Sequence, residues 1–428
     1  EAIRISVFLE SLGGGGAERF TQWLLTKLDR DRFQPPLLLL RGELEYSLPS
    51  DVHVDVLHQR PRHIQGPLLR AIAAGLDKQR PDVVVTPLMY PGQLLGRSLP
   101  FCSGSLRWIA RLGSPTPPRR LIHKVGFWRF RRVISAADAV IQNTRGGADA
   151  LRRQLPSLAD RVAYIPNAAP DAATSQPATK AGPTVAEGPT VADGPSVADG
   201  PSVAEGPSVA DGPSVAEGPS AAQGPSVAEG PSAALGPSVA EGPSVAEGPT
   251  VIWAGRLDRV KRPDLAVTAA AQALRRRPFR LKMFGDGPLR LEVQAQIERL
   301  GVQDRVALCG RSDALLDEMR QAHLFFLTSD SEGMPNAMIE AMSVGLPVVA
   351  TDCRFGPSEW VTAASGRLAK TGDAAGLANA ITELLGDEVR RQEMGAQARE
   401  QVLRQCRGDH LIEQWHSILS RQPAPATS

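Results

Sequence analysis

Two glutamates, Glu332 and Glu340, stand eight residues apart around an expected helix start. The apolar run at residues 324–327 is typical of a buried strand, and Pro335 favours a first helical turn. Glu332 is therefore expected in the loop after that strand, and Glu340 about two turns along the helix. A helix start stabilises an anionic phosphate, whereas ionised carboxylates accept hydrogen bonds from hydroxyls. This spacing predicts a ligand with hydroxyls on both sides of a phosphate, as in a sugar nucleotide.

Two cations could neutralise such a phosphate. Arg256 and Lys261 follow an apolar strand at residues 251–255 and precede a helix that begins near Pro263. Ligands of open parallel sheets bind at the carboxyl ends of strands, and Arg and Lys both suit phosphate oxygens. By itself, this pair is typical of solvated surface charge. Its position after a strand and upstream of the two glutamates favours diphosphate binding.

These segments together resemble the retaining GT-B glycosyltransferases of family 4, also described as glycosyl transferases group 1. The resemblance is close over residues 251–420 and weaker over residues 3–168. It rests on Gly255-Arg256-Leu257 with Lys261, Gly285-Asp286-Gly287-Pro288-Leu289, Glu332-x7-Glu340, Gly345 to Asp352, and the glycine-rich turn Gly13 to Arg19.

The resemblance implies an α/β fold of the GT-B type, with two Rossmann-like, doubly wound parallel-sheet domains facing a cleft. It implies that Arg256 and Lys261 bind the donor diphosphate, that Glu332 faces the transferred sugar, and that Glu340 binds the ribose. Glu332, Arg256 and Lys261 are thus the expected catalytic residues. The expected donor-binding residues are Gly15, Gly16, Gly333, Met334, Pro335, Asn336 and Glu340.

One departure from the family concerns the acceptor side. Many relatives carry a histidine near the sugar, after the fifth strand of the N-terminal domain. Here that stretch reads Ala110-Arg111-Leu112-Gly113-Ser114-Pro115. Arg111 and Ser114 are therefore the candidate acceptor residues, and the sequence leaves open which of them assists the acceptor.

Length and pattern agree with two α/β cores. The chain has 428 residues with 42% apolar content, and short apolar strands alternate with helical stretches. We expect an acceptor domain at residues 1–170, a linker at 171–250, a nucleotide-sugar donor domain at 251–410, and a helix crossing back to the first domain within 411–428. The crossing rests on the resemblance.

The linker region contains a hexapeptide repeat, Gly-Pro-Ser/Thr-Val-Ala-Glu/Asp, which occurs eleven times with minor variation between Gly182 and Glu247. Its small side chains cannot offset the entropy of ordering, so we predict a disordered spacer biased to polyproline II. A left-handed β-helix is the alternative, although a proline in every repeat removes a ladder donor.

Two other classes of function stay open. An NAD(P)-linked sugar-nucleotide oxidoreductase or epimerase fits the glycine run after the first strand, but the second strand ends in Arg41 instead of an acid. Such enzymes also need a Tyr-x-x-x-Lys pair, which Tyr46, Tyr90 and Tyr164 lack. A non-catalytic sugar-nucleotide-binding scaffold is the third class.

A basic segment at residues 119–132 interleaves cations with Phe127, Trp128 and Phe130. It predicts either an interfacial helix that binds anionic lipid through Arg129, Arg131 and Arg132, or an ordinary helix with solvated arginines. Nucleic acid is not an expected partner, because no RNA- or DNA-binding motif accompanies the segment.

The remaining signals concern cofactors and compartment. Four cysteines show neither metal spacing nor a disulfide framework, so we expect no protein-bound metal and no cofactor. A nucleotide sugar is then a substrate, and a carbohydrate or lipid-linked molecule is the acceptor. No apolar run is long enough to span a bilayer, which predicts a cytoplasmic protein, peripheral on the inner membrane face if the basic segment binds lipid.

Overall fold

The computed structural model describes residues 2–13, 15–59, 66–113, 131–170, 248–353 and 355–421. The predicted linker therefore lies outside the described residues, apart from its last three positions. We call the described residues between 2 and 170 the first lobe, and residues 248–405 the second lobe. Each lobe is built on its own parallel sheet, as the α/β prediction requires.

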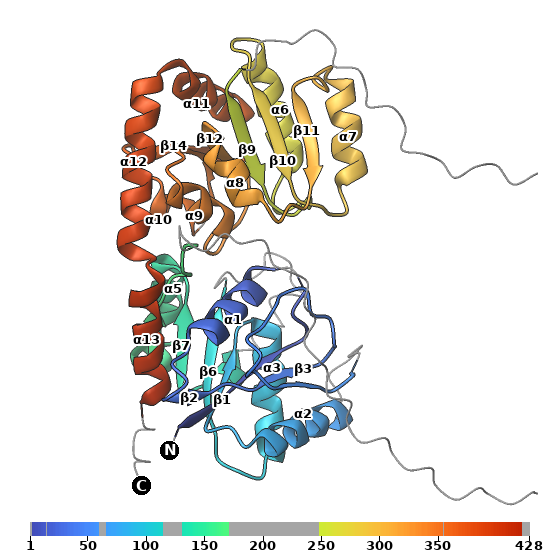
Figure 1. The fold of residues 1–428 in the computed structure, drawn as a ribbon, viewed down its shortest axis with the longest axis vertical. Helices are drawn as coiled ribbons and strands as arrows, with labels where there is room; N and C mark the ends of the chain where they lie inside the picture. Colours follow the sequence, from blue (N-terminus) through green and yellow to red (C-terminus); the bar gives the residue numbers. More distant parts are fainter. Residues whose placement is uncertain are drawn as a thin grey trace, which may run out of the picture. The chain divides into compact units, whose positions relative to one another are not determined.

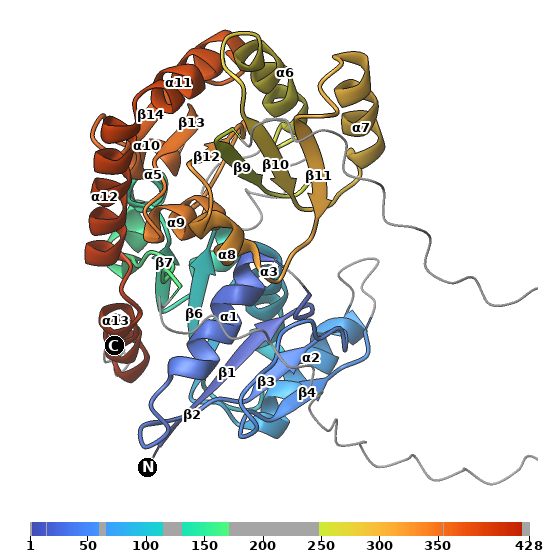
Figure 2. The ribbon, with the colours of Figure 1, turned by 45° about the horizontal axis from the view of Figure 1, so that its top comes forward.

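The first lobe holds an eight-stranded sheet with the order β4-β3-β1-β5-β6-β7-β8, and β2 pairs with β1. Figure 2 shows β1, β3 and β4 side by side. Its strands carry continuous apolar runs, because parallel strands are buried on both faces. They are β1 (Ile3–Leu9), β2 (Phe33–Gln34), β3 (Leu37–Leu39), β4 (Val54–Val56), β5 (Val83–Thr86), β6 (Arg107–Leu112), β7 (Ala139–Gln142) and β8 (Val162–Tyr164).

Helices cover both faces of this sheet, so the sheet is doubly wound. Ile109 of β6 packs in one core cluster with Phe20 of α1, whereas its neighbour Trp108 points to the other face and packs with Leu69 and Leu94. The helices are α1 (Gly16–Lys27), α2 (Gly66–Gln79), α3 (Met89–Ser98) and α5 (Arg145–Gln154), with short 3-10 turns η1 (Leu99–Phe101) and η2 (Pro156–Arg161).

The second lobe holds a six-stranded sheet with the order β11-β10-β9-β12-β13-β14. Figure 1 shows β9, β10 and β11 side by side. The strands are β9 (Thr250–Ala254), β10 (Arg280–Phe284), β11 (Val306–Gly310), β12 (Leu324–Leu327), β13 (Val348–Asp352) and β14 (Gly366–Lys370). The helices are α6 (Pro263–Leu274), α7 (Arg290–Arg299), α8 (Leu315–Arg320), α9 (Asn336–Ser343), α10 (Pro357–Trp360), α11 (Ala374–Gly386) and α12 (Glu388–Gln405).

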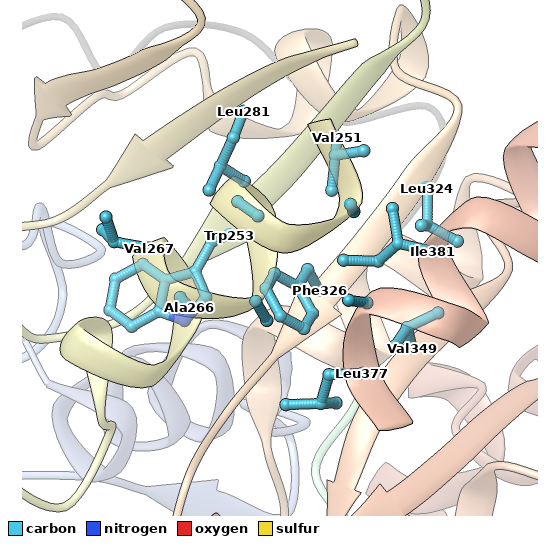
Figure 3. Packing of buried hydrophobic residues seen from close by; sticks show 14 of the residues in the cluster. Val251, Trp253, Ala266, Val267, Leu281, Leu324, Phe326, Val349, Leu377 and Ile381 are labelled. Carbon is cyan, nitrogen blue, oxygen red and sulfur yellow. The ribbon is translucent and has the colours of Figure 1, made fainter. Parts of the chain in front are cut away.

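A hydrophobic core holds β9 and β12 in place. These are the two central strands whose carboxyl ends carry the candidate site. Trp253 of β9 and Phe326 of β12 are fully buried beside Ala266 and Val267 of α6 (Figure 3). The indole N–H of Trp253 donates to the Thr328 hydroxyl at 2.9 Å, directly after β12. Burial of such aromatic side chains contributes about 2–3 kcal/mol each, so both strand ends are held firmly.

The chain ends in α13 (Gly408–Ser420), which packs with the first lobe. Leu411, Trp415 and Leu419 belong to the same core cluster as Ile5 and Phe20. Within the described part of the chain, no helix is both long and apolar enough to cross a membrane.

One local prediction was wrong. The helix begins at Asn336, because Pro335 has a ψ of 92°, which is not helical. Glu340 is therefore the fifth residue of α9, little more than one turn along and not two.

Candidate functional site

The loop after β9 carries Arg256 and Lys261, and a second glycine-rich loop braces it. The Leu257 amide donates to the Asp286 carbonyl at 3.0 Å, and the Leu289 amide donates back to Leu257 at the same distance. A Cβ added at Gly285, whose φ is +129°, would lie 1.9 Å from the Gly255 carbonyl oxygen. Only glycine allows this approach, which explains the Gly-Asp-Gly motif in physical terms.

Lys261 and Glu332 meet at the carboxyl ends of β9 and β12. The Lys261 ammonium donates to both carboxylate oxygens of Glu332, at 2.6 and 2.8 Å. The Ser329 hydroxyl donates to the same carboxylate at 2.6 Å. Glu332 is only 7% exposed. Its negative charge is balanced by Lys261, which belongs to the same lobe. The structure thus joins two residues that the sequence placed 71 positions apart.

Arg256 behaves differently. Its side chain is 72% exposed, and its Nε lies 3.9 Å from the carboxylate of Asp258. Arg256 lies in the same loop as Lys261 but takes no part in the Lys261–Glu332 pair. An exposed guanidinium on this braced loop is free to reorient toward an arriving anion.

The segment Gly333 to Asn336 contacts the first lobe. A Cβ at Gly333 would lie 1.8 Å from the Gly113 carbonyl oxygen, and one at Gly16 would lie 2.7 Å from the Asn336 amide nitrogen. Gly333 therefore permits a close approach of two backbones, and Gly16 leaves room for the Asn336 side chain. Gly15, also predicted here, instead accepts from the Tyr46 hydroxyl at 3.4 Å.

Glu340 is buried on α9, and Arg19 of α1 donates to its carboxylate. This ion pair joins the two lobes. The sequence did not lead us to predict Arg19 as a site residue, although it is the last residue of the glycine-rich turn Gly13 to Arg19. Half of the Arg19 side chain stays exposed. The signal for Arg19 was its place in that turn.

Arg111, a predicted acceptor residue, is 2% exposed at the carboxyl end of β6. Its guanidinium donates to the Asn167 side-chain oxygen and, at 3.4 Å, to the Pro87 carbonyl, and it stacks 4.0 Å from the ring centre of Phe20. Burial lowers the pKa of Arg111 to about 10, with no carboxylate contributing. This cation is thus held by neutral groups.

Asn167 links Arg111 to the second lobe. Its amide nitrogen donates to the Asn336 side-chain oxygen at 2.5 Å, and its backbone N–H lies 3.0 Å from the sulfur of Met334. Asn167 follows β8 in a segment without periodicity, so sequence reasoning did not single it out. The predicted residues Arg111, Met334 and Asn336 are brought together through it.

Two more buried amides lie at the end of β7. Among the described residues, neither side-chain polar atom of Gln142 and not the side-chain oxygen of Asn143 has a hydrogen-bond partner. Asn143 is 4% exposed, and its oxygen would lie 3.6 Å from a Cβ at Gly333. A buried polar atom without a partner costs about 1–3 kcal/mol, so such atoms are expected where a ligand binds.

The basic segment is only partly described. Ser114 and Arg129 lie outside the described residues. Arg131 donates to the Gln154 carbonyl at 2.6 Å, so it is engaged within the first lobe, whereas Arg132 is exposed. In the described part of the chain, no three His, Cys, Asp or Glu side chains gather as a metal site would require.

Solved structures share this fold. The Anabaena protein Alr3699/HepE in complex with UDP-glucose aligns with a TM-score of 0.69 at 17% identity, covering 98% of this chain and 99% of that one. The sucrose-phosphate synthase of Thermosynechococcus elongatus also gives 0.69 at 17% identity, covering 97% and 98%. The two sheets therefore form a GT-B fold.

Residues 239–401 match the family model described as Glycosyl transferases group 1. This region, and not the whole chain, carries the similarity to the glycosyl transferases group 1 family. It is 35% identical over 173 residues to the exopolysaccharide phosphotransferase SCO2592 of Streptomyces coelicolor, covering 40% of this chain and 18% of that protein. It is 30% identical over 160 residues to the N-acetyl-alpha-D-glucosaminyl L-malate synthase of Bacillus anthracis, covering 37% and 42%. The matches thus span less than half of either relative.

Proposed function

We propose that this protein is a retaining glycosyltransferase that moves a sugar from a UDP- or GDP-sugar to a carbohydrate, lipid-linked or small-molecule acceptor. The observation that carries the proposal is the buried Lys261–Glu332 pair beside the start of α9. A lysine, a carboxylate and a helix start meet there, as a diphosphate next to a hydroxylated ring requires.

The chemistry follows from these charges. As the bond between the anomeric carbon and the diphosphate breaks, negative charge grows on the leaving phosphate. Arg256, Lys261 and the amides near Gly333 to Asn336 stabilise it, without a metal or other cofactor. The anomeric carbon gains positive character, which the Glu332 carboxylate stabilises by position and charge. The acceptor oxygen then bonds to the same face of that carbon, and its proton passes to the departing phosphate oxygen.

Glu340 has a separate role in the proposal. It accepts hydrogen bonds from the ribose hydroxyls of the donor, because an ionised carboxylate only accepts. Since Arg19 occupies Glu340 in the structure, donor binding loosens that pair. The solved relative with bound UDP-glucose supports a uridine donor.

The test is a panel of sugar nucleotides with and without candidate acceptors. Release of nucleoside diphosphate, mass spectrometry of the product and the anomeric NMR coupling are read out. The proposal expects release from at least one donor, transfer with retention, and no change after EDTA. Release only with NAD(P)-dependent oxidation would favour the oxidoreductase alternative, and binding without turnover would favour the scaffold.

Contact with anionic membrane is a second, independent proposal. It rests on the basic, aromatic composition of residues 119–132 and on exposed Arg132. Sedimentation with vesicles containing phosphatidylglycerol should decrease when Arg129, Arg131 and Arg132 are replaced by Gln. Unchanged sedimentation would remove this proposal and leave the catalytic one untouched.

A further inference from the structure

Arg111 is an exception among the charged side chains buried in the described part of the chain. Apart from a histidine, these are Glu332, Glu340 and Arg111. Glu332 pairs with Lys261, and Glu340 pairs with Arg19, but only neutral oxygens and a ring face Arg111. Burying a charge without an opposite charge is costly.

A second arginine on the same strand shows a different set of partners. Arg107, at the other end of β6, donates to the carbonyls of Ile418 and Leu419 in the last turn of α13. Those carbonyls carry the negative end of a helix dipole, which suits a cation. Among the described residues, Arg111 donates to no carbonyl at a helix C-terminus, and its backbone acceptor, the Pro87 carbonyl, lies just before the start of α3. Its main acceptor is a side-chain amide, which can rotate away when a better acceptor arrives.

The surroundings of Arg111 are those of a ligand site. Asn143, one strand further along the sheet, has a buried side-chain oxygen without a partner, next to Gly333. Gly333 directly follows Glu332, so the Asn143 oxygen lies beside the loop that carries the proposed catalytic carboxylate. Both sit at the carboxyl ends of parallel strands, where such sheets bind ligands.

We propose that Arg111 and Asn143 select a donor whose transferred sugar carries a carboxylate, that is, a nucleotide-activated uronic acid. The inference rests on the proposed glycosyltransferase function and names its substrate class. The carboxylate accepts from the Arg111 guanidinium in place of Asn167, and a ring hydroxyl donates to Asn143. A neutral hexose leaves the cation unbalanced, so the site discriminates by charge.

The wild-type protein gives the first test. Matched donor pairs that differ only at C6 are UDP-glucuronate with UDP-glucose, UDP-galacturonate with UDP-galactose, and GDP-mannuronate with GDP-mannose. Diphosphate release without acceptor isolates the donor sugar. We expect kcat/KM for one uronate to exceed that for its hexose by roughly 100-fold or more. A preference for the neutral member of every pair that reacts overturns the inference.

Variants supply the second test. Arg111→Met should remove the preference, lowering the ratio of uronate to hexose kcat/KM by roughly 100-fold. Arg111→Lys should restore part of it. Arg107→Met is the matched control, because it removes a half-buried arginine from the same strand and should leave the ratio unchanged. A ratio unaltered in Arg111→Met contradicts the inference.

The two proposals fail in different ways. If neutral donors react and Arg111→Met leaves their ratio to uronates unchanged, the charge selection is wrong and the transferase function stands. If no sugar nucleotide in the panel is bound or cleaved, both are wrong. If Arg111→Met does not fold, the inference is tested by the ratio of uronate to hexose kcat/KM in the wild-type protein.

Discussion

The two strand-end clusters of this protein treat their charges in opposite ways. In the second lobe, the charges of Lys261 and Glu332 neutralise each other, and Ser329 adds a hydrogen bond. In the first lobe, Arg111 has no opposite charge and Asn143 has an unpaired oxygen. The second cluster is complete without a ligand, whereas the first leaves groups that a ligand would satisfy.

This difference indicates that the second-lobe cluster is preorganised for the reaction, whereas the first-lobe cluster selects the ligand. A paired carboxylate and lysine hold their geometry before the donor binds, which is what stabilisation of a developing charge needs. Unpaired groups cost stability, about 1–3 kcal/mol for each buried polar atom. The unpaired groups of the first lobe therefore indicate which ligand binds. The paired groups of the second lobe indicate which reaction is stabilised.

The largest expected effect comes from Glu332→Gln. It keeps the shape but removes the charge beside Lys261, so we expect diphosphate release to fall by roughly 100- to 1000-fold. Release is measured by a coupled assay at saturating donor.

Glu318→Gln is the matched control for that variant. Glu318 also pairs with a lysine of the second lobe, Lys282, at 2.8 Å, but the pair is about one-third exposed. Its loss should change the rate less than threefold. Equal effects of the two variants would mean that the buried pair is merely structural.

A smaller effect, on stability, is expected for Lys261→Met. It leaves the Glu332 carboxylate buried without an opposite charge, which costs roughly 2–3 kcal/mol after allowance for the part-exposed lysine. Urea unfolding measures the change, and Lys282→Met, on the exposed pair, should cost less than about 1 kcal/mol. Adding Glu332→Gln to Lys261→Met should restore most of the loss. No recovery would show that the lysine acts through packing.

Much of the second cluster could be predicted from the sequence, and the reason is local. Apolar runs such as residues 324–327 are strands in the structure, and Lys261 and Glu332 each follow a strand. Parallel strands end at one edge, so two loops after neighbouring strands meet. The family resemblance added the roles.

The first cluster could be predicted only in part. Arg111 was a candidate because it lies in the stretch where many relatives carry a histidine, but its lack of a carboxylate partner depends on packing against Phe20 and Asn167. The Arg19–Glu340 pair joins residues 321 positions apart, and no periodicity links them. Such contacts depend on how two separately folded sheets meet, which no short window of sequence contains.

The pair that joins the lobes gives a third prediction. Glu340→Gln should weaken UDP or GDP binding by roughly 10- to 100-fold, because a charged acceptor for the ribose hydroxyls is lost. Arg19→Gln breaks the same pair but leaves the carboxylate, so affinity should stay within a few-fold. Isothermal titration calorimetry compares the two variants. Equal losses of affinity in the two variants would mean that nucleotide binding depends on the Arg19–Glu340 ion pair and not on the Glu340 carboxylate by itself.

The smallest effect concerns Glu359, which belongs to α10 of the second lobe. Its carboxylate accepts from the backbone amides of Arg145 and Gly146, both at 2.8 Å, at the start of α5 in the first lobe. A carboxylate at a helix start stabilises it by about 0.5–1 kcal/mol. Glu359→Gln should therefore lower stability by that amount, measured by urea unfolding.

Asp373→Asn tests whether that contact differs from an ordinary cap. Asp373 accepts from the Gly376 amide at 2.8 Å and caps α11 within the second lobe. Both variants should lose similar stability, but only Glu359→Gln should speed amide hydrogen exchange at the start of α5, because only that carboxylate reaches across to the first lobe. If exchange in α5 is unchanged, Glu359 contributes no more than a surface contact. The unsatisfied first-lobe cluster would then be held near Gly333 by other contacts, such as the Asn167–Asn336 hydrogen bond and the Arg19–Glu340 pair.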